Sequence, residues 1–289
     1  MHTGRELNPL LEIEQLKVWF PIRRGLFSSL VGQVRAVDGV SLTVERRETL
    51  GLVGESGCGK TTLGRAIMGL EQPWSGALRF RGQDLLTLPE EQRQALRPHM
   101  QMVFQDPYTS LNPRLTVMDI ITEGLTTHRL LRGSRHAEAR RLLDEVGFPR
   151  DALRRYPFEF SGGQRQRISL ARALALRPQF IICDEALSAL DVSVQAQMLN
   201  LLMDLQHSHQ LAYLFISHDL GVVKHIADRV AVMYLGRIME VGPTQELMEQ
   251  PTHPYTQALS AAMRVPGRSP GARLILPGGP PSPIDPPPG

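Results

Sequence analysis

The sequence is poor in cysteine and in aromatic residues: two of its 289 residues are cysteine, and 6% are aromatic. Cys58 lies in a glycine-rich stretch and Cys183 in an apolar run, so neither is placed for a disulfide. Unpaired thiols are typical of cytosolic proteins. We therefore expect a cytosolic chain in which both thiols are reduced and Cys183 is a small buried side chain.

Long apolar runs are also missing. A membrane-spanning helix needs about 18 consecutive apolar residues, whereas the longest candidates, LAYLFI (211–216) and VAVMYL (230–235), have the length of strands. The first 16 residues lack the basic-then-apolar pattern of a secretory signal. The net charge of +3 is compatible with a membrane surface or an acidic partner without requiring either. If the protein works at a membrane, another polypeptide must hold it there.

Short apolar segments alternate with helix-length segments, which predicts an α/β fold with a mostly parallel sheet. The predicted strands are 11–20, 40–46, 49–53, 76–84 (an edge strand or hairpin), 100–104, 179–184, 211–217 and 229–235. Between about 106 and 178 helical periodicity replaces the strand pattern, in 116–131, 135–147 and 161–177, which indicates an inserted helical subdomain. The last 24 residues contain nine of the 22 prolines, and we expect an extended tail there.

The stretch GESGCGKTT (54–62) fits the phosphate-loop pattern, because it follows a predicted strand and opens a predicted helix. Gly54, Gly57 and Gly59 allow a tight turn in which successive N–H groups face phosphate oxygens. Lys60 is expected to reach the β- and γ-phosphates, and the Thr61 hydroxyl to bind Mg²⁺. A simple glycine-rich turn before a helix is the alternative. The predicted ATP-binding residues of this loop are Gly54, Glu55, Ser56, Gly57, Cys58, Gly59, Lys60, Thr61 and Thr62.

Acidic residues follow the apolar run FIIC at the expected carboxyl end of a strand, where open α/β sheets bind ligands. Asp184 is a candidate Mg²⁺ ligand, and Glu185 is suited to polarise the attacking water. Acidic residues are common at strand ends, so this pattern alone does not indicate a catalytic site. It supports one here because the chain also contains the phosphate loop with Lys60.

Two more predicted strands are followed by polar residues that would face the same crevice. Gln105 follows MQMVF and His218 follows LAYLFIS. The Gln105 amide can bind Mg²⁺ and orient water, while His218 can donate a hydrogen bond to a γ-phosphate as negative charge builds. Each alone would be read as a solvated loop residue. Their shared position favours the functional interpretation.

The stretch FSGGQRQR (160–167) is a second possible anion-binding helix start. Ser161 is a natural N-cap, and Gly162 and Gly163 leave the first-turn N–H groups unobstructed. An apolar stripe of Ile168, Ala171, Leu174 and Ala175 follows, with Arg165, Arg167 and Arg172 expected on the polar face. A capped helix with a solvated basic face is the alternative explanation.

In chain order, these motifs resemble the full motif set of an ABC-type ATPase, with SALD (188–191) as a further match. The resemblance covers roughly residues 10–265. It implies a P-loop NTPase core with an antiparallel β edge and the helical subdomain, an ABC ATPase domain over 10–250 and a C-terminal extension over 251–289. It also implies a dimer in which two cassettes hold two ATP molecules head to tail. The residues implied to face the partner's ATP are Ser161, Gly162, Gly163, Gln164 and Asp191.

Finer resemblance, in VFQDPYTSLNPRLTV (103–117), HPYTQAL (253–259) and the closing PPSPIDPPPG, is to the branch that imports oligopeptides, dipeptides or nickel. It implies that Phe20 stacks on adenine and that residues just after Gln105 lie near the surface for a permease coupling helix. The implied partners are a second ABC ATPase subunit, identical or homologous, two integral membrane permease subunits and, indirectly, an extracytoplasmic solute-binding protein. The implied location is the cytoplasmic membrane face, with ATP and Mg²⁺ as cofactors and no nucleic acid.

The chain departs from the family pattern at three places. Ala186 stands where a proline usually follows the catalytic glutamate, and Arg47 stands where a glycine commonly turns into the phosphate-loop strand. If that turn keeps a positive φ, the strain costs about 1–2 kcal/mol. The chain also ends before the short cysteine-rich segment of many relatives.

Three alternatives to a transport ATPase remain at this point. A soluble ABC ATPase acting on DNA or ribosomes usually has long coiled-coil or zinc inserts, or tandem cassettes, none of which this sequence shows. A module that binds ATP without hydrolysing it would not need Glu185, Gln105 and His218. A simple P-loop kinase leaves SGGQ unexplained.

Overall fold

The structure, a computed structural model, describes residues 9–24 and 29–262. It divides into two compact units: Met1–Leu88 together with Ile216–Gly289, and Pro89–Phe215. The predicted proline-rich tail lies outside the described residues. Within the described ranges, no helix combines the length and the apolar character needed to cross a bilayer.

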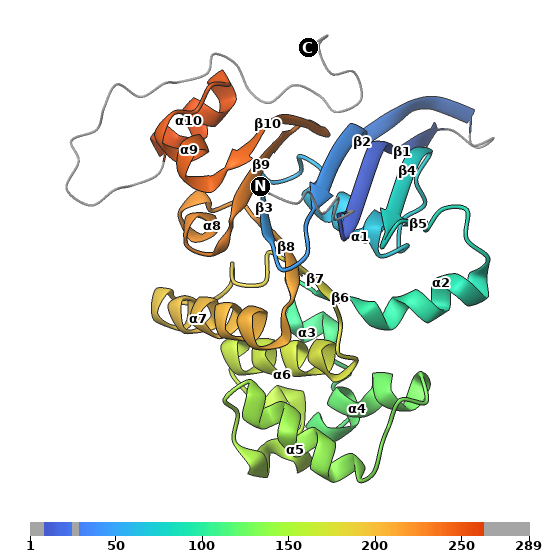
Figure 1. Cartoon of the computed structure of the whole chain (residues 1–289), viewed down its shortest axis with the longest axis vertical. Coiled ribbons are helices and arrows are strands. Elements are labelled where there is room, and N and C mark those ends of the chain that lie inside the picture. Colours follow the sequence, from blue (N-terminus) through green and yellow to red (C-terminus); the bar gives the residue numbers. More distant parts are fainter. Residues whose placement is uncertain (1–8, 25–28, 263–289) are drawn as a thin grey trace, which may run out of the picture. The chain divides into compact units, whose positions relative to one another are not determined.

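The first unit is built on two groups of strands. An antiparallel sheet has the order β2-β1-β4-β5, and a second group has the order β10-β9-β3, in which β3 and β9 are parallel. Helices α9 and α10 lie beside β10 (Figure 1). The elements are β1 (Leu11–Arg24), β2 (Ser29–Val44), β3 (Thr49–Val53), α1 (Lys60–Ile67), β4 (Ser75–Phe80), β5 (Gln83–Asp84), α8 (Leu220–Ile226), β9 (Arg229–Tyr234), β10 (Arg237–Pro243), α9 (Thr244–Glu249) and α10 (Pro254–Ala262).

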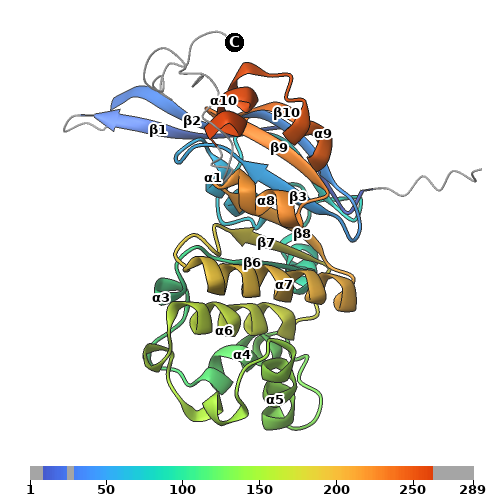
Figure 2. The ribbon, with the colours of Figure 1, turned by 90° about the vertical axis from the view of Figure 1, so that its left-hand side faces the viewer.

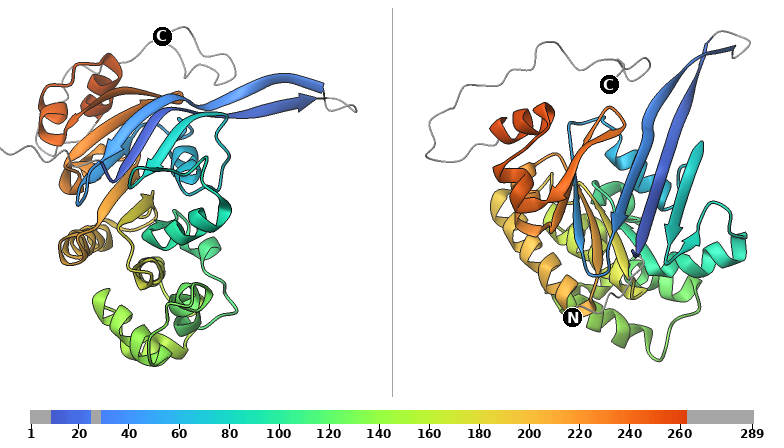
Figure 3. Two further views of the ribbon diagram at one scale, coloured as in Figure 1. Left: turned by 45° about the vertical axis from the view of Figure 1, so that its right-hand side comes forward. Right: turned by 45° about the horizontal axis from the view of Figure 1, so that its top comes forward.

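Strands β1 and β2 form a long antiparallel ribbon, visible at full length in Figure 3. The prediction of strands limited to 11–20 and 40–46 was therefore wrong at the ends: pairing continues to Arg24 and Ser29, and β2 ends at Val44. Several register shifts along the ribbon, such as the one between Ile13 and Leu16, interrupt the simple alternation of apolar and polar side chains. The alternation alone therefore underestimates the strands.

Both tryptophans of the chain belong to this unit. The rings of Trp19 and Trp74 are stacked with their centroids 6.0 Å apart. The indole N–H of Trp19 donates to Asp38 Oδ1 at 3.2 Å, and Lys17 and Arg35 lie about 5 Å from the same ring. The hydrogen bond fixes the orientation of the indole on the β1–β2 ribbon.

The second unit combines strands in the order β8-β7-β6, with β6 and β7 parallel, and a group of helices. Its elements are α2 (Glu90–Leu96), η1 (Arg97–His99), β6 (Met100–Val103), α3 (Pro107–Ser110), α4 (Val117–Thr127), α5 (Arg135–Glu145), η2 (Arg150–Arg154), η3 (Pro157–Glu159), α6 (Gly162–Ala175), β7 (Phe180–Asp184), α7 (Val192–His209) and β8 (Ala212–Ser217, whose last two residues begin the return to the first unit). The parallel pairs and the antiparallel sheet confirm the predicted α/β class. Helices α3 to α6 lie in the predicted helical range 106–178, and the domain boundaries themselves stay a prediction.

Helix α6 is the centre of the helical part of the second unit. It contacts α4, α5 and α7 and also packs on β6 (Figure 2). The predicted apolar stripe is confirmed, because Ile168, Ala171, Leu174 and Ala175 are all at most 2% exposed. Full burial of such a stripe is what makes a helix of average propensity stable.

The three arginines of α6 do not form a solvated basic face, which was the alternative explanation for this helix. Arg165 is buried and donates to the carbonyl oxygens of Pro157 and Phe158 at 2.7 and 3.2 Å. Arg167 donates to Val146 O and Arg172 to Ser110 O, at 2.9 and 2.7 Å. Carbonyl groups at loop and helix ends need such donors, so these arginines fasten the surrounding loops to α6.

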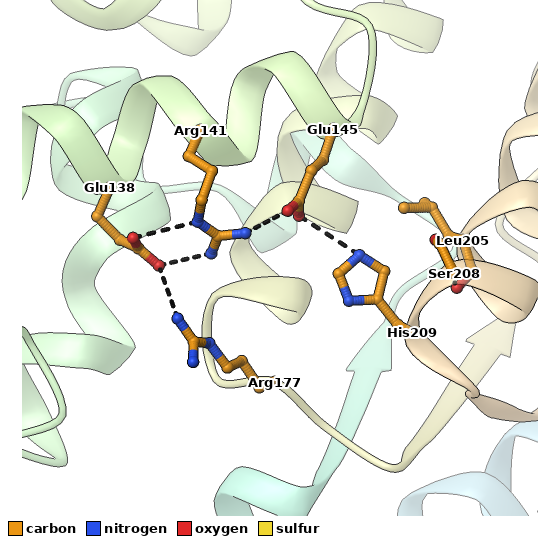
Figure 4. Close-up of polar contacts among 7 residues, drawn as sticks. All are labelled: Glu138, Arg141, Glu145, Arg177, Leu205, Ser208 and His209. Atoms are coloured by element: carbon orange, nitrogen blue, oxygen red, sulfur yellow. Dashed lines mark hydrogen bonds and ion pairs between the residues drawn. The ribbon is translucent and has the colours of Figure 1, made fainter.

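A chain of ion pairs connects α5 with the end of α7 (Figure 4). Arg141 pairs with Glu138 and with Glu145, one turn away on each side along α5. Glu138 also lies 4.0 Å from Arg177, and Glu145 lies 3.6 Å from the ring nitrogen of His209. The hydrogen bond from Arg141 holds the pKa of the Glu138 carboxyl below its usual range, so this carboxylate keeps its charge beside Arg141 at neutral pH.

Candidate functional site

The glycine-rich loop connects β3 with α1, as the sequence predicted. All five residues of β3 are buried, and the loop leaves this strand at Gly54. Lys60 is 3% exposed, and its ammonium donates to the carbonyl oxygens of Gly54 and Glu55 at 2.9 and 2.8 Å. The lysine side chain is therefore folded back across the loop, with its charge at the centre of the turn.

The start of α1 fits a phosphate group. Gly59 is the N-cap residue with φ of 108°, and no side chain caps the helix there. A Cβ atom on Gly59 would lie 2.0 Å from the carbonyl oxygen of Ala36, so only glycine fits. An uncapped helix start beside a buried lysine is the donor arrangement that binds phosphate oxygens. The loop therefore fits the triphosphate of a nucleotide.

The other predicted residues of the first unit lie on β1, in or beside the loop, or after β8. Phe20, on β1, is 37% exposed, which leaves part of its ring accessible. Thr61 and Thr62 are half-buried in the first turn of α1, whereas Glu55, Ser56 and Gly57 are exposed. His218 is exposed and immediately follows β8.

Two hydrogen bonds from other parts of the first unit hold the backbone of the phosphate loop. The N–H of Gly236 donates to Cys58 O at 2.9 Å, and the phenol oxygen of Tyr255 accepts the N–H of Glu55 at 3.1 Å. Burial raises the pKa of the Cys58 thiol despite the opposing charge of Lys60, so Cys58 stays a neutral thiol. Tyr255 was not among the predicted site residues, although the HPYTQAL stretch (253–259) contains it.

The carboxylates of the second unit stand at the end of β7. Asp184 is the last residue of this strand and is 3% exposed. Glu185 follows with φ of 44°, a conformation that is strained for a residue with a side chain. Gln105, two residues past β6, donates from Nε2 to Glu185 Oε2 at 3.0 Å. Two predicted site residues from different strands are thus joined directly.

Cys183, which precedes Asp184 and Glu185, is a buried and unreactive thiol. Burial, together with the charge of Asp184, raises the pKa of the Cys183 thiol to about 12. Cys183 is 1% exposed, so the prediction of a small buried side chain is confirmed.

The SGGQ stretch begins helix α6. Ser161 is the N-cap, confirming that prediction: its hydroxyl accepts the Gln164 N–H, and Gln164 Oε1 accepts the Ser161 N–H. Gly163 is buried against α7, where a Cβ atom would lie 2.6 Å from Val194 Cγ1. Ser161 and Gln164 are exposed, so the helix start faces outward.

Asp191 is the N-cap of α7. Its carboxylate accepts the Val194 N–H at 2.9 Å and the Ser193 hydroxyl at 2.7 Å. These bonds, led by that from Val194, lower the pKa of the Asp191 carboxyl. Asp191 and the helix start at Gly163 are thereby held by the same end of α7.

A polar hollow of about 620 Å³ lies elsewhere on the first unit. It is lined by residues of β1, β2 and β10, including Lys17, Trp19, Arg35 and Arg237. None of the predicted site residues lines it. Arg237 is bonded to the buried Asp38 carboxylate, so part of the local charge is already neutralised.

The phosphate loop on an α/β core defines a P-loop nucleotide-binding protein. A family profile described as ABC transporter matches residues 37–188, and one described as oligopeptide/dipeptide transporter, C-terminal region, matches residues 239–289. The chain belongs to the ABC transporter family, as an ATP-binding protein and ATPase of its oligopeptide/dipeptide branch. The family, the ATPase class and the P-loop fold that the sequence predicted are confirmed.

Individual relatives are similar over almost the whole chain. The oligopeptide transport ATP-binding protein AppF of Bacillus subtilis is 51% identical, over 99% of this chain and 89% of the relative. A probable peptide ABC transporter ATP-binding protein of Sinorhizobium fredii is 55% identical, over 97% and 80%. Among solved structures, cbiO1 from Clostridium perfringens, part of the ABC transporter complex cbiONQ, matches with a TM-score of 0.71 at 24% identity, over 84% and 91%.

Proposed function

We propose that the chain is the ATP-hydrolysing subunit that powers an importer for peptides across the cytoplasmic membrane. The match of residues 239–289 to the C-terminal region of oligopeptide and dipeptide transporters carries the proposal. The names of the two relatives above, an oligopeptide and a peptide transport protein, support it. Members of the family bind ATP, and their ATPases work with membrane permease components.

In the first unit, we assign the triphosphate to the loop 54–62. Lys60 would turn from the Gly54 and Glu55 carbonyl groups to the β- and γ-phosphates. Phe20 would stack on adenine through the accessible part of its ring. His218 would donate a hydrogen bond to the γ-phosphate as charge builds during hydrolysis.

In the second unit, we assign the chemistry of hydrolysis to the end of β7. Glu185 would act as general base on the attacking water, with Gln105 orienting both through the bond that already joins the two side chains. Asp184, Gln105 and, from the first unit, Thr61 are the proposed Mg²⁺ ligands, since oxygen atoms are the ligands that this ion prefers. Mg²⁺ would neutralise charge on the phosphates.

We propose that the exposed start of α6 serves the ATP of a second ABC ATPase subunit. The residues assigned to that role are Ser161, Gly162, Gly163, Gln164 and Asp191. The remaining proposed partners are two integral membrane permease subunits and, through them, an extracytoplasmic solute-binding protein, with the chain at the cytoplasmic face. Tyr108, three residues after Gln105, is 64% exposed, which supports a permease contact at this surface.

Transport is tested by co-purifying the chain with its permease subunits and measuring ATP-dependent uptake into vesicles. Labelled di- and oligopeptides are expected to accumulate, and nickel is not. The same branch of the family imports either peptides or nickel, so the transported cargo separates the two alternatives. Uptake of nickel without uptake of any peptide would contradict the proposal.

Changing Glu185 to Gln tests the site. The variant keeps the size and the contact with Gln105 but loses the base, so ATP turnover is expected to fall by about 10²–10⁴-fold. Phosphate release from the assembled protein is the measurement. Glu91→Gln, which removes an exposed acid of α2, serves as the matched control and should hydrolyse ATP normally. Near-normal turnover by Glu185→Gln would remove Glu185 from this role.

A further inference from the structure

The C-terminal segment 252–256 is fastened to β10 by one carboxylate. Glu240 accepts the Thr252 N–H at 2.9 Å, the Thr252 hydroxyl at 2.8 Å and the His253 N–H at 3.1 Å. Burial opposes ionisation, but the hydrogen bonds from this segment outweigh it and lower the pKa of the Glu240 carboxyl to about 2. The carboxylate is therefore charged at neutral pH and fixes the turn that leads into α10.

This turn places the Tyr255 hydroxyl within hydrogen-bond distance of the phosphate loop, at the N–H of Glu55. Tyr255 is 4% exposed, and its ring contacts Tyr234 at the end of β9 with centroids 4.4 Å apart. Its N–H donates to His253 Nδ1 at 3.1 Å. The side chain is thus held by packing and by the preceding turn, so its hydroxyl has one well-defined position.

The Tyr255 hydroxyl and Lys60 hold the same loop residue from two sides. Tyr255 accepts the N–H of Glu55, 200 residues away in the sequence, and Lys60 donates to the Glu55 carbonyl. The following residues have less support: at Gly57, a Cβ atom would find no other atom within 4 Å. Together with the bond from the Gly236 N–H to Cys58 O, these fixed points keep the N–H groups of the loop aligned for phosphate.

We propose that Tyr255 is a positioning residue, by which the C-terminal segment holds the phosphate loop in its nucleotide-binding conformation. The inference rests on the proposed ATPase function and adds to it a residue that lies outside the predicted nucleotide-binding residues, in the HPYTQAL stretch (253–259). It also gives the C-terminal segment a role in nucleotide affinity. Displacement of residues 252–256 from Glu240 would release the loop.

Tyr255→Phe tests the proposal, because it removes only the hydroxyl. Loss of one neutral hydrogen bond that aligns the loop is expected to raise the KM for ATP by about three- to tenfold, with kcat changed less than about twofold. Amide hydrogen exchange at Glu55, measured without nucleotide, is expected to accelerate, because Tyr255 accepts that proton. A merely structural loss elsewhere in the chain would not change exchange at this single amide.

Tyr213→Phe is the matched control. Its hydroxyl is also buried and donates to a backbone carbonyl, Leu202 O, at 3.1 Å, but in the second unit. This variant should lose similar stability and keep both the KM for ATP and the Glu55 exchange rate. If Tyr255→Phe matches this control in both measurements, the proposal is wrong.

Glu240→Gln provides a second test if Tyr255→Phe does not fold. It weakens the anchor of the segment and leaves Tyr255 intact, so the same rise in KM and the same faster exchange at Glu55 are expected, and their absence would overturn the proposal. The exchange measurement also separates two failures. A wild-type chain that does not hydrolyse ATP would contradict the proposed function. Exchange at Glu55 that stays as slow in the Tyr255→Phe and Glu240→Gln variants as in the wild type would contradict the positioning role of Tyr255.

Discussion

Arg47 has a backbone conformation that a side chain makes costly. Its φ is 64°, in the turn between β2 and β3 that leads to the phosphate loop. The condition under which the sequence implies strain is therefore met, and the strain amounts to about 1–2 kcal/mol. The turn is still formed because Glu48 and the buried ends of both strands hold it: Glu48 Oε2 accepts the Glu45 N–H.

Replacing Arg47 with glycine should therefore stabilise the protein. We expect the free energy of unfolding to rise by about 1 kcal/mol, since glycine adopts this φ without the steric cost. Urea unfolding at neutral pH is the measurement. Arg46→Gly is the control, because Arg46 has a negative φ; it should lose about 0.5–1 kcal/mol through the greater freedom of the unfolded chain. An equal loss in both variants would contradict strain at Arg47.

Residues at strand ends could be predicted from the sequence, whereas residues whose partners are brought close only by folding could not. Asp184, Glu185 and Gln105 could be selected as candidates because they lie at or just after strand ends, a pattern that is local in the sequence. The buried partners of Arg165 could not be found in this way, because the carbonyl groups of Pro157 and Phe158 need a donor only after the loop has folded. The same holds for Tyr255, whose partner is 200 residues away.

At the scale of elements, the anchor of α10 on β10 makes stability depend on pH. The folded-state pKa of Glu240, about 2, lies below the ordinary value of 4.5. A depressed pKa means that the stabilisation is present above the unfolded value and is lost as pH falls through 4.5 toward 2. The free energy of unfolding should therefore decrease below about pH 4.5 as the hydrogen bonds to Glu240 are lost.

Glu240→Gln tests this dependence. The difference in free energy of unfolding between the wild type and this variant should be largest near neutral pH and should shrink below about pH 4.5. Urea unfolding from pH 7 down to pH 3 gives the profile. Glu249→Gln, an exposed acid at the end of α9, should show little difference at any pH. A difference for Glu240→Gln that stays constant down to pH 3 would rule out the anchor as the cause.

Element types were predicted well where the apolar pattern is simple and less well where tertiary pairing extends a strand. Strands β3, β7 and β9 are fully or almost fully buried, and their apolar runs gave their positions closely. The β1–β2 ribbon continues through charged residues such as Arg35 and Asp38, whose strand conformation depends on the partner strand. Pairing of this kind is not visible in one segment of sequence.

At the scale of the whole molecule, the proposed arrangement predicts that a single copy hydrolyses ATP poorly. The exposed start of α6 serves another subunit in this proposal, so each chain lacks part of its own site. Turnover per chain is expected to fall on dilution and to recover when a second cassette, a copy or a paralogue, is added. Phosphate release over a range of protein concentrations, with light scattering to follow assembly, is the measurement. Full turnover by a demonstrated monomer would contradict the head-to-tail proposal.

The stacked pair of Trp19 and Trp74 has a practical consequence. These are the chain's only tryptophans, so all of its indole emission originates from one place on the ribbon. Trp19 directly precedes Phe20 in β1, and its ring is oriented by Asp38. The unlabelled protein therefore carries its own optical probe, the stacked indole pair, one residue from the proposed adenine contact, and no other tryptophan contributes to the signal.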